Sequence, residues 1–177
     1  TYASSQRITV TNERSHLIMG FIDVIKERAK SNIKTIVLPE TEDMRTLEAA
    51  DKILKEGIAK LVLVGNEEAV KKSAAEGGFD ISGAQIVDPA TSEKTQGYID
   101  KLVELRQKKG MTPEQAKELL LNNYLYYGVM MVKMGDADGM VSGACHSTAD
   151  TLRPCLQILK TKPGTKLVSA FFLMVVP

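Results

Sequence analysis

The sequence has 177 residues, which is enough for one α/β domain with a substantial hydrophobic core. Hydrophobic residues make up 44% and charged residues 25% of it, a balance typical of a globular protein rather than a disordered one. The net charge of +1 and the aromatic content of 5% argue against a nucleic-acid-binding protein or one attached to an anionic membrane.

The cysteines and the ends of the chain give further expectations. Cys145 and Cys155 form no C-x-x-C pair and no zinc-type spacing with histidines, so we expect free thiols in a cytoplasmic protein without a metal. The longest apolar run, 168–176, is too short to span a membrane. Residues 1–18 are polar and lack a period, so we predict a non-native or disordered extension before Met19. Because the chain ends at Pro177 beside an apolar run, we predict that the domain 19–177 is truncated there.

The first half of the chain alternates between predicted helices and strands. Apolar spacing predicts a helix over 21–29, and short apolar runs predict buried strands at 35–38, 61–64 and 85–87. A second helix begins after Thr41, which we expect to cap it, and ends at Gly57. A third helix is predicted from about Glu67 to Glu76.

The alternation continues in the second half. A helix around 99–105 ends at Gly110, and the next begins at Thr112 with Pro113 in its first turn and Gln115 completing a capping box. A helix follows over 124–134, then a strand at 139–141, a helix to about Lys160 and a fifth strand within 166–176. This order predicts an α/β fold with three αβα layers, in which helices cover both faces of an open, mostly parallel, Rossmann-like sheet.

The densest polar cluster follows the predicted strand at 139–141. Ligands of open α/β sheets bind beyond the carboxyl ends of the strands, so the segment 142–154 is the first place to look for a site. Hydroxyls, small residues and a guanidinium together predict an oxyanion or phosphate site, built from Ser142, Gly143, Ser147, Thr148, Thr151 and Arg153. The alternative is structural, since Ser147 and Asp150 also form a capping box and Arg153 fits a surface ion pair.

Other candidates in and near this segment remain open. His146 suits a base or a phosphate donor as well as a structural hydrogen bond, and Cys145 suits a nucleophile or, better, small-residue packing. Arg106 fits a favourable contact with a helix dipole. Pro154 either kinks a helix that begins at Ser147 or lies in the first turn of one that begins near Leu152. Because the sequence lacks G-x-G-x-x-G, G-x-x-x-x-G-K-[ST] and G-x-S-x-G, it argues against a dinucleotide dehydrogenase, a P-loop kinase and a serine hydrolase.

Several segments resemble the phosphotransacetylases of the phosphate acetyl/butyryltransferase family. The similar segments are 37–47, 63–66, 86–89, 169–174 and, most specifically, 138–154. The resemblance runs from Met19 to Pro177 and implies the first domain of a two-domain, homodimeric enzyme with its active site in the cleft between the domains. It also implies that the second domain carries a catalytic Ser-Arg-Asp group, so we expect the chain alone to be inactive.

The resemblance implies reversible transfer of an acetyl group between acetyl phosphate and coenzyme A. In this reaction Arg153 would be the catalytic residue that binds the phosphoryl group, and Ser147, Thr148 and Thr151 would form hydrogen bonds to it. Arg106 would lie near the coenzyme A or phosphate end. Coenzyme A is then a substrate, and neither a cofactor nor a metal is implied. The alternatives are a phosphate butyryltransferase, a non-catalytic ligand-sensing domain like those appended to malic enzymes, and a purely structural fragment.

Overall fold

A parallel sheet of four strands forms the centre of the protein. The computed structural model describes residues 20–168, so the predicted extension at 1–18 lies outside the described residues. The strands are β1 (Thr35–Leu38), β2 (Lys60–Val64), β3 (Gln85–Val87) and β4 (Gly139–Met140), in the order β3-β2-β1-β4. Thr35 lies opposite Lys60, and Ile36 lies opposite Gly139. The predicted parallel sheet and its first four strands are confirmed.

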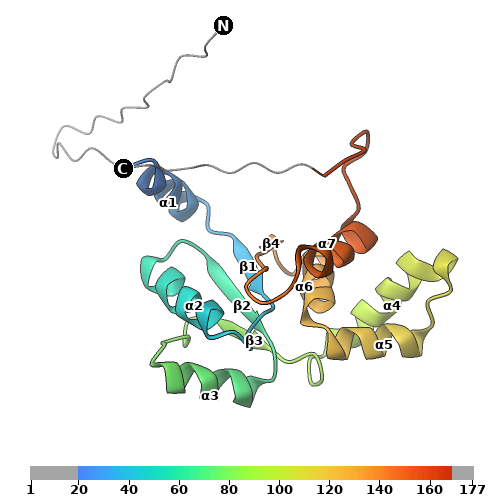
Figure 1. The fold of residues 1–177 in the computed structure, drawn as a ribbon, viewed down its shortest axis with the longest axis horizontal. Helices are drawn as coiled ribbons and strands as arrows, with labels where there is room; N and C mark the ends of the chain where they lie inside the picture. The colour runs from blue at the N-terminus through green and yellow to red at the C-terminus, as the bar shows by residue number, and fades with distance from the viewer. Residues whose placement is uncertain (1–19, 169–177) are drawn as a thin grey trace, which may run out of the picture.

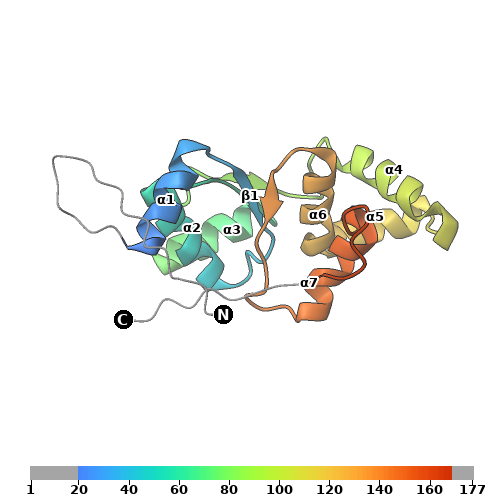
Figure 2. The same cartoon turned by 90° about the horizontal axis from the view of Figure 1, so that it is seen from above.

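Helices cover both faces of this sheet, as Figures 1 and 2 show. Leu61 and Leu63 pack in one core with α2 (Met44–Glu56) and α3 (Glu67–Gly77). Val62 and Val64 alternate with them and pack in the other core, with the helices α4 (Thr95–Arg106), α5 (Pro113–Asn122) and α6 (Tyr124–Met134). Because successive side chains of a strand point to opposite faces, these apolar strands join two cores. The predicted three αβα layers are confirmed.

α6 approaches the sheet very closely at Gly128. A Cβ atom on this residue would lie 2.9 Å from Sδ of Met140 on β4 and 3.1 Å from Cγ1 of Val37 on β1. Glycine therefore allows α6 to lie directly against the two strands whose carboxyl ends lie next to each other.

The ends of the helices follow local signals with one exception. The capping box at Thr112 and Gln115 is confirmed, with backbone-to-side-chain distances of 3.1 and 3.3 Å. Gly57 ends α2 with φ 65°, as predicted. The expected cap at Thr41 is wrong: Asp43 caps α2, accepting a hydrogen bond from the N–H of Arg45, because the Thr41 hydroxyl donates instead to the carbonyl of Val64 at 2.8 Å.

The remaining elements are the first helix, a short helix after α4, and the last helical segment of the described chain. α1 (Phe21–Ser31) buries none of its residues against the described part of the protein. The short helix η1 (Gln107–Lys109) extends α4 to Gly110, as predicted. α7 (Thr148–Pro154) has Ser147 as its N-cap and continues as a π-helix, η2 (Cys155–Leu159), so Pro154 lies inside a helix that begins at Ser147.

The predicted fifth strand is only partly covered by the structure. Residues 166–168 adopt no strand and 169–176 lie outside the described residues, so a fifth strand within 166–176 stays a prediction. None of the described helices is both long enough and apolar enough to cross a membrane.

Candidate functional site

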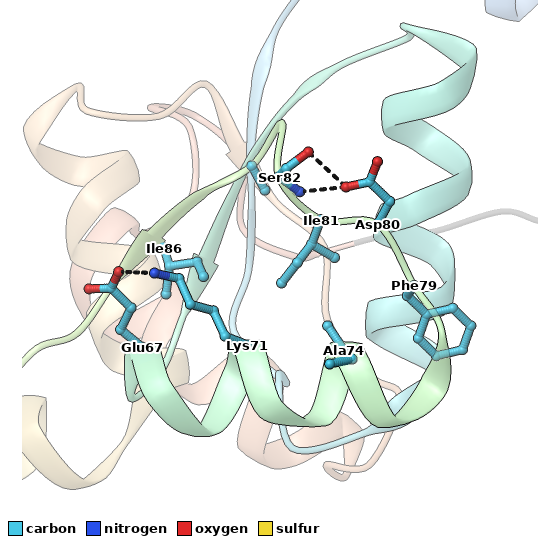
Figure 3. Close-up of a pocket in the computed structure, with 10 residues that line it drawn as sticks. Glu67, Lys71, Ala74, Phe79, Asp80, Ile81, Ser82 and Ile86 are labelled. Carbon is cyan, nitrogen blue, oxygen red and sulfur yellow. Dashed lines mark hydrogen bonds and ion pairs between the residues drawn. The ribbon is translucent and has the colours of Figure 1, made fainter.

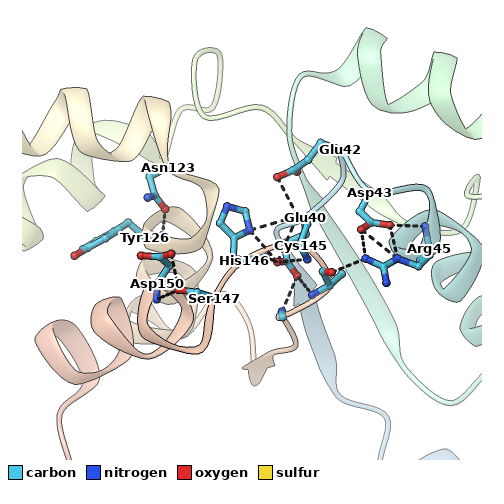
Figure 4. Close-up of polar contacts among 12 residues, drawn as sticks. Glu40, Glu42, Asp43, Arg45, Asn123, Tyr126, Cys145, His146, Ser147 and Asp150 are labelled. Carbon is cyan, nitrogen blue, oxygen red and sulfur yellow. Dashed lines mark hydrogen bonds and ion pairs between the residues drawn. The ribbon is translucent and has the colours of Figure 1, made fainter.

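The candidate site lies where β1 and β4 end side by side. Glu40 follows β1, and the loop 141–147 follows β4 and leads into α7. This is the edge at which parallel sheets bind ligands. Figure 4 shows the loop folded around the Glu40 side chain, with α6 and α7 on one side and α2 on the other.

Glu40 is the centre of this arrangement, although its side chain is only 2% exposed. One carboxylate oxygen, Oε2, accepts hydrogen bonds from the N–H groups of Gly143 at 2.7 Å and Ala144 at 2.8 Å. The other, Oε1, accepts from the N–H groups of Cys145 at 3.1 Å and His146 at 2.9 Å. One buried carboxylate therefore binds four consecutive backbone amides.

These hydrogen bonds keep Glu40 ionised. Burial by itself would raise the pKa of the carboxyl, but the amide of Ala144, the His146 ring and the amides of Cys145 and Gly143 stabilise its charged form. The pKa of Glu40 is consequently held far below its usual range. Nδ1 of His146 lies 2.8 Å from Oε1, so the imidazole belongs to the same network.

Two further contacts fix the loop. Gly143 adopts φ 112°, a conformation that side chains disfavour, so glycine is required at this turn. Arg45 donates a hydrogen bond to the carbonyl of Ala144 and forms an ion pair with Asp43 at 2.6 Å. The cap of α2 is thereby tied to the loop after β4.

Cys145 has the properties of a poor nucleophile. Removal from water, followed by the negative charges of Glu42 and Glu40, raises the pKa of its thiol to about 11. Glu40, Cys145 and His146 also lie close enough together for metal binding. However, the four amides and the imidazole already occupy the lone pairs of Glu40, which leaves the carboxylate no free position for a metal.

Arg106 and Arg153 come from different helices but act on the same hydroxyl. Burial raises the pKa of Tyr126, and the positive charges of Arg153 and then Arg106 oppose this rise. The Tyr126 hydroxyl also donates to Oε1 of Gln157 at 3.0 Å. The end of α4 and the end of α7 therefore each carry a positive charge that acts electrostatically on Tyr126 at the start of α6.

Three of the predicted site residues carry buried polar atoms that lack a hydrogen-bond partner within residues 20–168. These atoms are Nε of Arg106, Oγ of Ser142 and Oγ1 of Thr151. An unpaired buried polar group costs about 1–3 kcal/mol, so such atoms call for an explanation. A polar ligand that accepts and donates hydrogen bonds would supply one.

The other predicted residues have local partners or face solvent. Ser147 accepts a hydrogen bond from the N–H of Asp150 at 3.2 Å and donates to its carboxylate at 2.6 Å, so Ser147 caps α7, and its contact with a ligand stays a prediction. Thr148 is exposed. The Arg153 side chain is 57% exposed and pairs with Asp150 at 3.3 Å. Because exposed ion pairs contribute only about 0–1 kcal/mol, this pair leaves Arg153 available to an anion.

Two cavities differ in their relation to this site. A cavity of about 310 Å³ lies beside His146 and is lined also by Glu42, Leu121, Asn122, Asn123 and Tyr124. A larger one of about 480 Å³ lies between α3 and β3 (Figure 3). In the larger cavity Lys71 pairs with Glu67, and Asp80 binds Ser82. It is lined by none of the predicted site residues, so the cavity beside His146 is the relevant one.

The sequence interpretation did not identify Glu40, Arg45 or Tyr126 as part of the site. A charged residue directly after a buried strand was the available signal for Glu40, because such positions lie at the ligand-binding edge. Arg45 and Tyr126 gave no comparable signal, since both fit ordinary positions in a helix.

Comparisons with known proteins agree with this geometry. The family model described as phosphate acetyl/butaryl transferase matches residues 20–177. Phosphate acetyltransferase of Acetivibrio thermocellus is 60% identical over 159 residues, and that of Thermoanaerobacterium thermosaccharolyticum is 57% identical over 159 residues. Each alignment covers 90% of this chain and 47% and 48% of the respective relative. The chain thus spans about half the length of these relatives.

Solved structures give the same result. The EutD phosphotransacetylase from Staphylococcus aureus has a TM-score of 0.75 at 44% identity, over 82% of this chain and 44% of its own. A phosphotransacetylase from Streptococcus pyogenes has a TM-score of 0.77 at 39% identity, over 84% and 46%. With a family model that matches nearly all of it, the chain belongs to the phosphate acetyl/butaryl transferase family.

Proposed function

We propose that the protein containing this chain transfers an acetyl group between acetyl phosphate and coenzyme A. The family and the names of the similar relatives support the reaction class, and the relatives named above as phosphate acetyltransferases favour acetyl over butyryl. We also infer, from the resemblance, a homodimer in the cytoplasm.

In this proposal the sulfur of coenzyme A attacks the carbonyl carbon of acetyl phosphate. The new C–S bond forms, the bond between carbon and the bridging phosphate oxygen breaks, and inorganic phosphate leaves. The thiol proton goes to a base, which the resemblance places in the second half of such enzymes. The chemistry therefore requires the protein mainly to position two anionic substrates and to stabilise the charge on the leaving phosphate.

The observation that carries the proposal is the set of buried, unpaired polar atoms on three predicted site residues. Arg106 and Arg153 bring two positive charges to one region, and Arg106, Ser142 and Thr151 each hold a buried polar atom without a partner in the described chain. A phosphoryl group provides several acceptor oxygens and negative charge, and planar guanidinium groups match it well. We assign phosphoryl binding to Arg153 and Arg106, with Ser142 and Thr151 as hydroxyl partners.

Ser147, Thr148, Gly143 and His146 have weaker support as direct phosphate ligands. The amides of Gly143 and His146 are bound by Glu40, and the hydroxyl of Ser147 is bound to Asp150. Ser147 would have to exchange Asp150 for the substrate, whereas the exposed hydroxyl of Thr148 is free to turn.

The test uses the full-length polypeptide with acetyl phosphate and coenzyme A, and measures acetyl-CoA formation. Arg153→Ala is expected to lower kcat/KM for acetyl phosphate by roughly 100- to 1000-fold, the usual effect of removing one group that stabilises transition-state charge. Arg28→Ala, which removes an exposed arginine of α1, is the control and is expected to leave the rate unchanged. Full activity of Arg153→Ala would contradict the assignment of Arg153, and a wild type active only with butyryl phosphate would contradict the acetyl assignment.

A further inference from the structure

Glu40 is the most deeply buried charge at the site, and the proposed reaction gives it no direct role. Four consecutive N–H groups, from Gly143 to His146, point at its carboxylate. Such a run of amides is an anion-binding concavity, and here the anion is the protein's own side chain. The substrate phosphate therefore has no access to these amides, and their function is to hold the loop on Glu40.

The contact between Glu40 and His146 determines which ring nitrogen of His146 carries a hydrogen. An ionised carboxylate only accepts hydrogen bonds, so the 2.8 Å contact between Oε1 and Nδ1 requires the hydrogen to be on Nδ1. In the neutral imidazole, Nε2 then carries a free lone pair. A third group that orients an imidazole in this way is a recurring feature of sites in which the other ring nitrogen handles a proton.

The second ring nitrogen lies on the side of the cavity beside His146. In Figure 4 the second ring nitrogen points away from Glu40, on the side of Asn123. His146 lines the 310 Å³ cavity together with Asn123 and Tyr124, and its side chain is 35% exposed. A small group in this cavity can therefore reach Nε2.

We propose that Glu40 is a positioning residue, which holds the loop 142–147 and fixes the His146 tautomer so that Nε2 accepts a hydrogen from a substrate group in the cavity. This inference rests on the proposed function. In that reaction, two substrate groups can donate a hydrogen bond to Nε2: the thiol of coenzyme A and a protonated oxygen of phosphate. The shared chemistry is an ionisable S–H or O–H group that donates to Nε2.

Two substitutions separate the two parts of the proposal. Glu40→Gln keeps the size of the side chain but replaces one acceptor oxygen by an NH₂ group. This group cannot accept hydrogen bonds from the backbone amides or from Nδ1, so it no longer holds the imidazole in one tautomer. His146→Asn keeps an N–H donor near the position of Nδ1 and removes Nε2, so it preserves the loop and deletes the acceptor. Glu40→Asp retains the charge and is the conservative variant.

Asp51→Asn is the matched control. Asp51 is also a buried carboxylate, 8% exposed, and it accepts hydrogen bonds from the Asp80 amide at 3.2 Å and from Lys55 at 2.7 Å. Asp51 lies on α2, and neither of these two partners belongs to the loop 142–147. Its loss tests the effect of removing a buried charge without disturbing the site.

The first measurement is the ¹⁵N NMR spectrum of the histidine rings in the full-length protein, with His146→Asn used for assignment. Hydrogen on Nδ1 and a bare Nε2 are expected in the wild type and in Asp51→Asn, and a ring that carries hydrogen on both nitrogens would overturn the proposal. A mixture of tautomers is expected in Glu40→Gln, with recovery in Glu40→Asp. A wild-type ring protonated only on Nε2, or an unchanged spectrum in folded Glu40→Gln, would overturn the proposal. This readout requires no activity, so it stays informative if the proposed reaction proves wrong.

The second measurement is steady-state kinetics in both directions. Both Glu40→Gln and His146→Asn are expected to lower kcat/KM by roughly 100-fold, the scale of a misplaced group at a reacting centre. A thiol donor predicts a higher KM for coenzyme A, and a phosphate donor predicts a higher KM for inorganic phosphate. Kinetics of His146→Asn within twofold of wild type would overturn the role of Nε2 even if Glu40→Gln does not fold.

Discussion

Gly128 sets the distance between α6 and the sheet, and its substitution by alanine tests whether that distance matters. The added methyl group would lie 2.9 Å from Sδ of Met140 and 3.1 Å from Cγ1 of Val37. The thioether of Met140 is flexible and can move, whereas Val37 lies on the central strand and is fully buried. We therefore expect α6 to shift away from β1 and β4, or the strand side chains to adopt strained rotamers.

The magnitude follows from two opposing effects. Replacing a helical glycine by alanine stabilises a helix by about 1 kcal/mol, because glycine loses more backbone entropy on folding. Overpacking a tight core typically costs about 1–3 kcal/mol. Gly97 supplies the reference, because it lies on α4 and a Cβ there meets nothing within 4 Å. Gly97→Ala should raise the free energy of unfolding by about 1 kcal/mol, and Gly128→Ala should fall about 1–3 kcal/mol below it.

Urea denaturation of both variants, followed by circular dichroism, measures this difference. Both variants contain the same change from glycine to alanine in a helix, so the intrinsic helix preference of alanine largely cancels between them. The remaining difference in the free energy of unfolding measures the cost of the contact between residue 128 and the sheet. Equal free energies of unfolding for the two variants would refute the reasoning, because they would mean that the sheet tolerates a methyl group at no cost.

Two further predictions concern charge at the site. Because the pKa of Glu40 is lowered in the folded state, its stabilising effect is present above the unfolded pKa of about 4.3 and is lost as the pH falls through the folded pKa. The free energy of unfolding should therefore decrease below about pH 4, and less steeply in Glu40→Gln; equal slopes in urea titrations would contradict this. With a pKa of about 11 against an ordinary 9.0, Cys145 should hold roughly 100-fold less thiolate near neutral pH and should react with iodoacetamide more slowly than a free thiol, measured in a Cys155→Ser background. Glu42→Gln should accelerate the reaction, and alkylation at the rate of a free thiol would disprove the raised pKa.

The parts of the fold that depend on local patterns were predictable. The strand at 35–38 and the helix at 124–134 follow from short apolar runs and helical spacing, and the structure has both at these bounds. The capping box at Thr112 depends on residues three positions apart, so the sequence contains all the information that it needs.

The parts that depend on distant partners were not predictable. The Thr41 hydroxyl binds a carbonyl 23 residues away on β2, and this contact moves the cap of α2 to Asp43. The four amides that bind Glu40 lie 103 to 106 residues away. A charged residue is buried only when such partners exist, and periodicity gives no information about them. The sequence therefore located the loop 142–154 but not the carboxylate that holds it.

The separation between Glu40 and its loop also has a consequence for the order of folding. β1 pairs with β2 across 25 residues at Thr35 and Lys60, whereas β1 pairs with β4 across 103 residues at Ile36 and Gly139. Closing the longer loop costs more chain entropy, so β4 and the Glu40 contacts are expected to form after the β1–β2 pair. The edge of the sheet that carries the candidate site is then assembled on a scaffold that is already folded, and weakening the Glu40 contacts would speed unfolding more than it slows folding.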